Sequence, residues 1–173
     1  TVAVVGDGAV GLCAVLAAVQ LGAPTVIAMS RHAARQQVAR EFGATDIVAE
    51  RDEAGMAAVR ELTNGIGADC VLECVGTEQA RLQAIGCVRD GGNIGLVGVP
   101  HGDLPVNDLF WRNVGIKGGP AHCRTYLPEL MEKVLARTIN PGLVFDLELP
   151  LAQIGEAYAA MDERRAIKSL VRP

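Results

Sequence analysis

TVAVVGDGAVGL, residues 1–12, joins an apolar segment to a glycine-rich loop. Its first six residues are a short, β-branched run, which is typical of a strand that is covered on both faces. Gly6, Gly8 and Gly11 then form a G-x-G-x-x-G motif, and the apolar residues after it indicate a helix that begins at Ala9. Such a loop between a strand and a helix predicts a dinucleotide site, because the first helical amides can bind a pyrophosphate. No G-K-[ST] sequence follows, which excludes a P-loop.

Segments with the patterns of strands and helices alternate along the chain. Strands are expected at residues 1–6, 25–30, 46–49, 68–76, 93–99 and 113–118. Helical stripes lie after the first, second, third, fourth and sixth of these, over residues 9–21, 34–42, 52–62, 77–88 and 127–135. Repeated βα units with short connections predict an α/β fold, a doubly wound, six-stranded parallel sheet of the Rossmann type.

The last part of the chain has a different pattern. Apolar residues alternate from Leu143 to Leu149, which predicts a strand that is buried on one face only. A helical stripe from Ile154 to Met161 and a final strand in AIKSLVRP, residues 166–173, follow. We therefore expect a Rossmann domain over residues 1–140 and a strand-helix-strand tail over residues 141–173 that belongs to a second domain.

Composition narrows the function classes. Sixteen basic and twenty acidic residues give a net charge of -4 with no basic run, so a nucleic-acid partner is not expected. The longest apolar stretch, from Ala9 to Val19, is too short to span a bilayer, and no membrane association is expected. The cysteines are odd in number and are interpreted as packing residues of a cytoplasmic protein: Cys13, Cys70, Cys74, Cys87 and Cys123.

The end of the second strand bears on the choice of cofactor. An acid at this place accepts hydrogen bonds from the ribose hydroxyls and selects NAD. In this sequence the strand ends in Ser30 and Arg31. A small hydroxyl removes the repulsion of a 2′-phosphate, and a guanidinium can bind that phosphate through charge-assisted hydrogen bonds. Arg35 lies one helical turn later and can add a second cation, so the pattern favours NADP over NAD.

Two features oppose this interpretation. Ser30 can cap the following helix while Arg31 stays solvated, although capping and phosphate binding are compatible. Glu50 ends the third strand and should lie near the same pocket. Its carboxylate would oppose a phosphate unless it turns away or pairs with Arg51.

The motifs together resemble the coenzyme domain of the medium-chain, zinc-dependent alcohol dehydrogenase family. The resemblance covers essentially the whole chain and is carried by VVGDGAVGL, AREFGATDIV, ECVG, GGNIGLVGVP and LPLAQIGEAYAAMDERRAIKSLVRP. It implies hydride transfer between an alcohol or carbonyl compound and NADP or NAD. It also implies that zinc is bound in a catalytic domain, which we expect to precede Thr1 in a longer polypeptide, so that the chain alone is inactive. Family members commonly pair through the sixth strand, which implies a homodimer or homotetramer.

The resemblance also assigns roles to individual residues. Val10 would pack behind the nicotinamide ring, and the backbone near Val97, Val99 and Gly115 would hold its carboxamide. On the adenosine side, two residues of ECVG would flank the cofactor, and a basic residue of the tail would approach the pyrophosphate. The complete predicted cofactor set is Gly6, Gly8, Ala9, Val10, Gly11, Ser30, Arg31, Arg35, Cys74, Val75, Val97, Val99 and Lys168. No partner pattern surrounds His32, His101 or His122, for which surface or loop positions are expected.

Two alternatives remain open from the sequence. The first is the zinc-free quinone-reductase branch of the same superfamily, which a cysteine and a G-H-E segment upstream would argue against. The second is a module that binds a dinucleotide to regulate a partner without catalysis. The tail after Pro141 argues against the second, since a sensing module does not need it.

Overall fold

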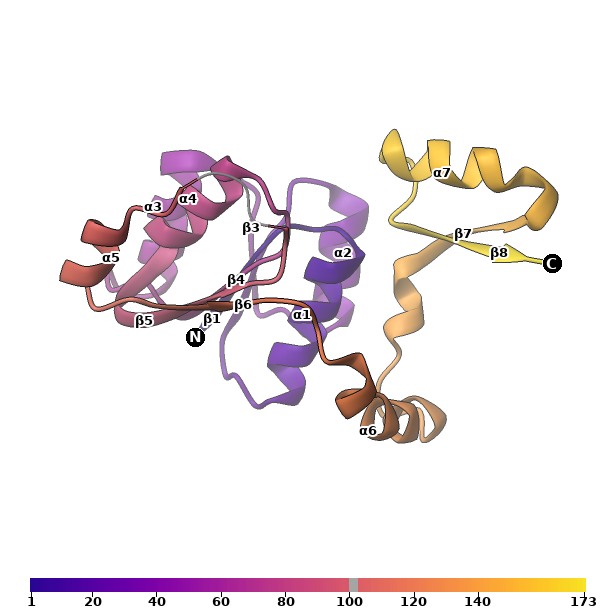
Figure 1. The fold of residues 1–173 in the computed structure, drawn as a ribbon, viewed down its shortest axis with the longest axis horizontal. Coiled ribbons are helices and arrows are strands. Elements are labelled where there is room, and N and C mark those ends of the chain that lie inside the picture. The colour runs from indigo at the N-terminus through magenta and orange to yellow at the C-terminus, as the bar shows by residue number, and fades with distance from the viewer. Residues whose placement is uncertain (100–102) are drawn as a thin grey trace. The chain divides into compact units, whose positions relative to one another are not determined.

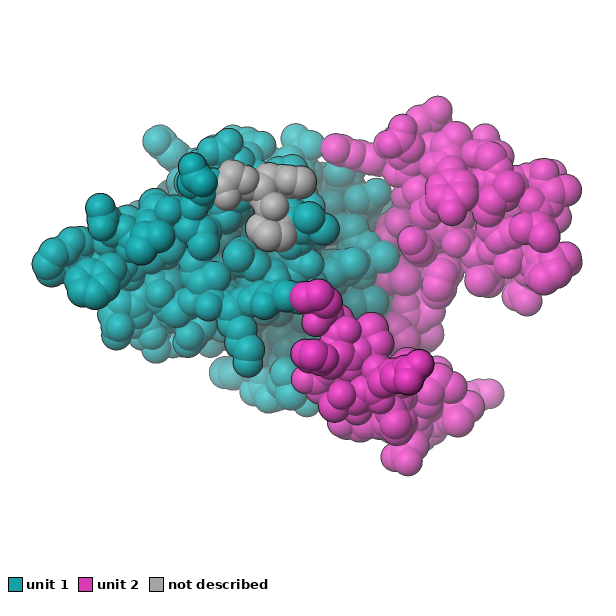
Figure 2. All heavy atoms as spheres, in the orientation of Figure 1, with its two compact units in different colours: residues 1–119 teal, residues 120–173 magenta. Residues whose placement is uncertain are grey.

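A computed structural model of the chain describes residues 1–99 and 103–173. The chain divides into two compact units, residues 1–119 and 120–173, which are coloured separately in Figure 2. The first unit contains a six-stranded sheet and the second a two-stranded sheet (Figure 1). The division into compact units falls after Gly119 and places residues 120–140 in the second unit. The domain boundary expected after residue 140 stays a prediction.

The larger sheet has the strand order β3-β2-β1-β4-β5-β6, and all its neighbouring strands are parallel. This order confirms the predicted doubly wound α/β fold. The carboxyl ends of β1 and β2 lie side by side, because Val5 pairs with Met29. The strands are β1 Val2–Val5, β2 Val26–Met29, β3 Asp46–Val48, β4 Ala68–Glu73, β5 Val88–Leu96 and β6 Gly115–Gly118.

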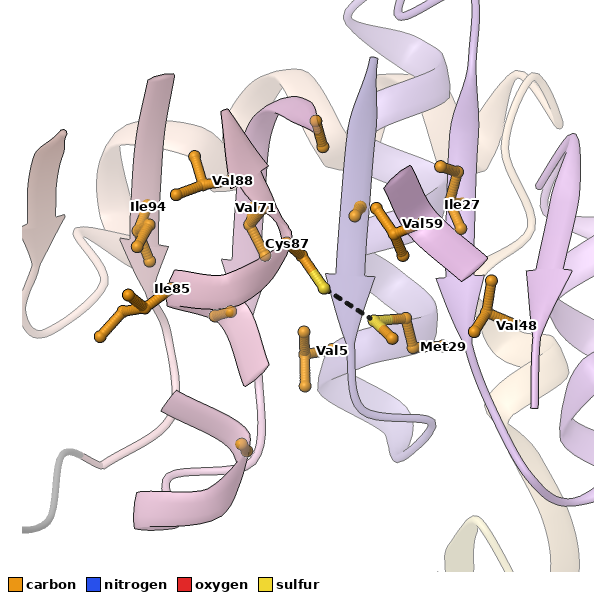
Figure 3. Close-up of a cluster of buried hydrophobic side chains, with 14 of the residues drawn as sticks. Val5, Ile27, Met29, Val48, Val59, Val71, Ile85, Cys87, Val88 and Ile94 are labelled. Atoms are coloured by element: carbon orange, nitrogen blue, oxygen red, sulfur yellow. Dashed lines mark hydrogen bonds between the residues drawn. The ribbon is translucent and has the colours of Figure 1, made fainter. Parts of the chain in front are cut away.

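Helices cover both faces of the central strands, whose residues are therefore apolar on both faces. Val5 and Ile27 belong to a buried cluster with Val59 of α3 and Cys87 of α4, which lie on the same side of the sheet in Figure 3. The Cys87 Sγ atom lies 3.9 Å from Met29 Sδ within this cluster. Val4 is equally buried but faces the other side, where α1 packs against β1 and β2. The helices of this unit are α1 Ala9–Gln20, α2 Ala33–Glu41, α3 Asp52–Leu62, α4 Glu78–Cys87 and α5 Val106–Trp111.

Two elements differ from the prediction. β5 begins at Val88, directly after α4, and ends at Leu96, whereas the sequence analysis expects a strand only over residues 93–99. The register shifts between Ala68 and Cys70 of β4, which accommodates the extra residues. The short helix α5 was not expected, because its six residues are fewer than two helical turns and give little periodic pattern.

The second unit contains the predicted strand-helix-strand segment. β7 Phe145–Pro150 and β8 Lys168–Arg172 pair in parallel, and α7 Ile154–Asp162 connects them. Asp146 ties the two strands together by accepting the backbone N–H of Ile167 at 2.8 Å. The remaining elements are α6 Cys123–Leu135, η1 Pro141–Val144 and η2 Leu151–Gln153.

None of the helices in the described part of the chain has both the length and the apolar character needed to span a membrane.

Candidate dinucleotide-binding site

The glycine loop between β1 and α1 has the backbone shape that a dinucleotide needs. Gly6 has φ +116°, a left-handed conformation that permits a sharp turn after β1. A Cβ atom on Gly8 would meet nothing within 4 Å, so the backbone is open to a ligand at this point. A Cβ atom on Gly11 would lie 2.0 Å from the carbonyl oxygen of Gly6, so α1 can approach the strand only because residue 11 is glycine. These three positions fit a bound pyrophosphate.

The first turn of α1 leaves its amides available. Gly8 caps the helix without a side chain, and the first turn contains no acidic residue. The backbone N–H groups of Ala9 and Val10 therefore have no side-chain acceptor on the helix itself. Together with the positive end of the helix dipole, such amides form an anion site.

A pocket opens at the carboxyl ends of β1 to β4, and its empty space is about 430 Å³ when the open solvent at its mouth is included. Four of the predicted cofactor residues line it: Gly6, Ser30, Arg31 and Val75. Glu50 also lines the pocket, as the sequence predicts, so the candidate phosphate ligand and the opposing acid share one site. The lining residues that the sequence did not indicate are Val5, Met29, Ala49, Arg51, Thr77, Gln79, Ala80 and Gln83.

Asp7, the residue between the first two glycines, is the centre of a polar cluster that the sequence did not reveal. Its Oδ2 atom accepts hydrogen bonds from Ser30 Oγ at 3.0 Å and His32 Nδ1 at 2.7 Å. Its Oδ1 atom accepts one from Arg35 Nη1 at 3.2 Å. Burial alone would raise the pKa of Asp7, but the hydrogen bonds from His32 and Ser30 and the charge of Arg35 outweigh it and lower the pKa. Asp7 is therefore a carboxylate at neutral pH.

This cluster changes the interpretation of three residues. Ser30 and Arg35 both donate hydrogen bonds to Asp7. The sequence analysis instead expected Ser30 to leave room for a 2′-phosphate and Arg35 to add a second cation beside it. His32 lies in the loop before α2, as expected, but it has a partner that the sequence did not reveal, Asp7. His122 is exposed immediately before α6, as expected, and His101 lies outside the described residues. The sequence could have indicated this cluster, because Asp7 and residues 30–35 follow two strands that are neighbours in a parallel sheet. The turns after such strands lie side by side.

Glu73 organises the turn that follows β4. Its carboxylate is 1% exposed, and Oε1 accepts the backbone N–H groups of Val75 at 2.7 Å and Gly76 at 2.8 Å. Its backbone carbonyl accepts the N–H groups of Val97 at 2.8 Å and Gly98 at 2.9 Å. The ECVG motif thus joins the ends of β4 and β5 beside the glycine loop.

Four valines with predicted cofactor contacts are unusually exposed for apolar residues. Val10 is 53% exposed, Val75 50%, Val97 51% and Val99 72%. Val75 lies against the loop, since a Cβ atom on Gly6 would be 2.7 Å from its Cγ2 atom. Exposed apolar side chains around an anion site are what an aromatic ring and a ribose would cover.

Two other assignments are not supported by position. Gly115 begins β6, so it lies at the opposite end of that strand from the loop, and Gly118 occupies the nearer end. Lys168 lies in the second unit, where it is exposed and its backbone N–H donates to Asp146 Oδ1 at 3.3 Å. Its approach to a pyrophosphate stays a prediction.

The cysteines are all free thiols. Cys74 is half-buried, and Cys87 is buried; burial raises the pKa of each to about 12, so both stay protonated and serve in packing. Glu73 adds to the effect at Cys74. The packing interpretation was wrong for Cys123, which is exposed at the start of α6.

Within residues 1–99 and 103–173, no group of three His, Cys, Asp or Glu side chains could hold a metal ion. The zinc that the sequence resemblance implies therefore finds no ligand set in the described part of this chain.

Known proteins resemble the chain throughout its length. Residues 9–136 match the family model described as zinc-binding dehydrogenase. Alcohol dehydrogenase 1 of Zea mays is 35% identical over 99% of this chain and 48% of its own length. Zinc-type alcohol dehydrogenase B of Aspergillus flavus is 31% identical over 99% of this chain and 41% of its own length.

Solved structures agree. Alcohol dehydrogenase TADH from Thermus sp. ATN1 superimposes with a TM-score of 0.90 at 31% identity, over 99% of this chain and 50% of that protein. The chain thus spans about half the length of the relatives it matches. With its glycine loop and strand order, it belongs to the zinc-binding dehydrogenase family, of which it represents the coenzyme-binding part.

Proposed function

We propose that this chain binds NADP as the coenzyme-binding part of a zinc-dependent alcohol dehydrogenase. The whole enzyme would transfer a hydride between an alcohol or carbonyl compound and the nicotinamide. One observation carries the cofactor choice: β2 is followed by Ser30 and Arg31 instead of an acid, and exposed Arg31 lines the pocket at the carboxyl end of that strand. An exposed guanidinium at this place suits a 2′-phosphate.

Different residues would contact different parts of the cofactor. The amides of Ala9 and Val10 bind the pyrophosphate, which reaches them because the backbone at Gly8 is open. Val97 and Val99 exclude water from the nicotinamide, which accepts or supplies the hydride when the cofactor is bound.

At the other end of the site, Val75 packs against the adenosine and Arg31 binds the 2′-phosphate. The Ser30 hydroxyl donates a hydrogen bond to Asp7, and because it carries no charge it does not repel the phosphate. Arg35 supports the site by balancing the charge of Asp7.

The rest of the reaction is assigned to the part of the relatives that this chain does not match. That part would supply the zinc ion and most of the substrate pocket. The assembly would be a homodimer or homotetramer in the cytoplasm, with β6 at the interface. This assignment is supported by the position of β6 at the edge of the sheet, where it pairs only with β5 among the described strands.

Calorimetric titration with NADP and NAD tests the cofactor choice. The parent is expected to bind NADP more tightly, and Arg31→Ala to weaken NADP about tenfold with little effect on NAD, because one charge-assisted contact is lost. Ser30→Asp should also weaken NADP more than NAD, since it adds a second carboxylate beside Asp7 at this pocket and that charge repels a 2′-phosphate.

Arg40→Ala is the matched control, because Arg40 is an exposed arginine of α2 that does not line the pocket. Equal affinities of the parent for the two cofactors, with no loss in Arg31→Ala, would refute the preference for NADP.

A further inference from the structure

Asp7 occupies a position to which the glycine motif assigns no role. It is 9% exposed, and a buried carboxylate is costly unless donors surround it. Ser30, His32 and Arg35 are those donors, and all three come from the turn between β2 and α2 and the start of that helix. Asp7 therefore ties the loop that would bind the pyrophosphate to the segment that would meet the adenosine ribose.

Two of the residues that donate hydrogen bonds to Asp7 are the sequence neighbours of Arg31. Ser30 precedes Arg31 and His32 follows it, and both side chains donate to the same carboxylate oxygen, at 3.0 and 2.7 Å. Ser30 is buried, whereas Arg31 is exposed and lines the pocket. The backbone on either side of the exposed cation is thus fixed by one buried anion.

The charge of Asp7 is compensated and turned away from the pocket. Asp7 is not among the lining residues, and Arg35 Nη1 lies 3.2 Å from its Oδ1 atom. A carboxylate that is paired with a cation repels a nearby phosphate less than an unpaired one, since its partner's charge opposes its own. Asp7 differs in this way from an acid at the end of β2, which would face the ribose.

We propose that Asp7 is a positioning residue that sets the preference of this site for NADP over NAD, acting through Arg31. The inference rests on the proposed function, because it concerns the same pocket. Asp7 itself touches no cofactor atom in this role. It holds Ser30 and His32 so that the intervening guanidinium meets the 2′-phosphate.

A double-mutant cycle tests this inference. Asp7→Asn keeps the size of the side chain and removes its charge, while Arg31→Ala removes the cation on which it is proposed to act. The dissociation constants of NADP and NAD are measured by calorimetry for the parent, both single variants and the double variant. We expect Asp7→Asn to lower the preference for NADP about tenfold and to have no further effect on it in the Arg31→Ala background.

The ratio of the two affinities separates positioning from general damage. A loop that is merely disordered by Asp7→Asn would lose both cofactors equally, because both contain the pyrophosphate, and this result would overturn the inference. An unchanged or increased preference for NADP would also overturn it. A parent without a preference for NADP would refute the proposed function, whereas the role of Asp7 is judged by the change in the ratio.

Two further variants support the cycle. His32→Ala removes the 2.7 Å hydrogen bond and leaves Asp7 in place, so it keeps the test decisive if Asp7→Asn does not fold. It should lower the ratio in the same direction, and an unchanged ratio would count against the inference. Asp162→Asn removes the same charge from an exposed position on α7 and should change neither affinity.

Discussion

Replacing Gly8 and Gly11 one at a time with alanine is expected to have very different effects on the free energy of unfolding. Gly11→Ala should lower the free energy of unfolding by about 3 kcal/mol or more, because the new Cβ would stand 2.0 Å from a backbone oxygen of Gly6 that has little room to move. Gly8→Ala should change that free energy by less than about 1 kcal/mol, since its Cβ meets nothing within 4 Å and its φ of −76° suits any residue.

Gly8→Ala and Gly11→Ala together distinguish an effect on cofactor affinity from an effect on stability. Gly8→Ala should weaken NADP and NAD alike, by about tenfold or more, because the added methyl group stands where the pyrophosphate approaches the backbone. Urea unfolding and calorimetric titration measure the two effects on the same samples. A Gly8→Ala variant that binds both cofactors as tightly as the parent would show that the dinucleotide does not cross this loop.

Truncation of Glu73 is expected to destabilise the fold about as much as Gly11→Ala. Glu73→Ala should cost about 4 kcal/mol of unfolding free energy, because it leaves a cavity and removes the acceptor of the part-buried N–H of Val75 and the buried N–H of Gly76. Glu73→Gln should cost about 2 kcal/mol, since its amide oxygen can still accept both bonds but loses the charge that strengthens them. Both variants should also weaken cofactor binding, because Val75 lines the pocket.

Glu78→Gln provides the control for Glu73. It removes the same charge five residues later, from an exposed position in the first turn of α4, and should cost less than about 1 kcal/mol. If Glu73→Gln were as stable as Glu78→Gln, the buried carboxylate would have no structural role in the turn after β4.

Most of the fold could be predicted because its signals are local and repeated. β1 and β2 read as continuous apolar runs since helices cover both of their faces, and the G-x-G-x-x-G motif fixes the first connection. The prediction failed where the signal depends on tertiary context. β5 begins five residues earlier than expected, because a register shift against β4 accommodates the two glycines Gly91 and Gly92 within the strand. α5 is too short to show a periodic pattern.

The site could be predicted only in part for the same reason. The glycine loop and Arg31 could be singled out because sequence position in a known type of fold suggests the roles proposed for them. The hydrogen-bond cluster around Asp7 was missed because it depends on three donors that are 23 to 28 residues away and reach Asp7 only when β1 and β2 pair. Ser30 and Arg35 were identified as important residues, but their hydrogen-bond partner was not.

A crystal structure of the chain grown with NADP would decide whether the loop and the adjoining pocket are the cofactor site. The pyrophosphate is expected within hydrogen-bond distance of the backbone amides that follow Gly8, with the adenosine in the pocket between Val75 and Arg31 and the 2′-phosphate on the Arg31 guanidinium. NADP bound at another place, or a loop that stays empty when the cofactor is saturating, would contradict the assignment of this chain as a dinucleotide-binding protein.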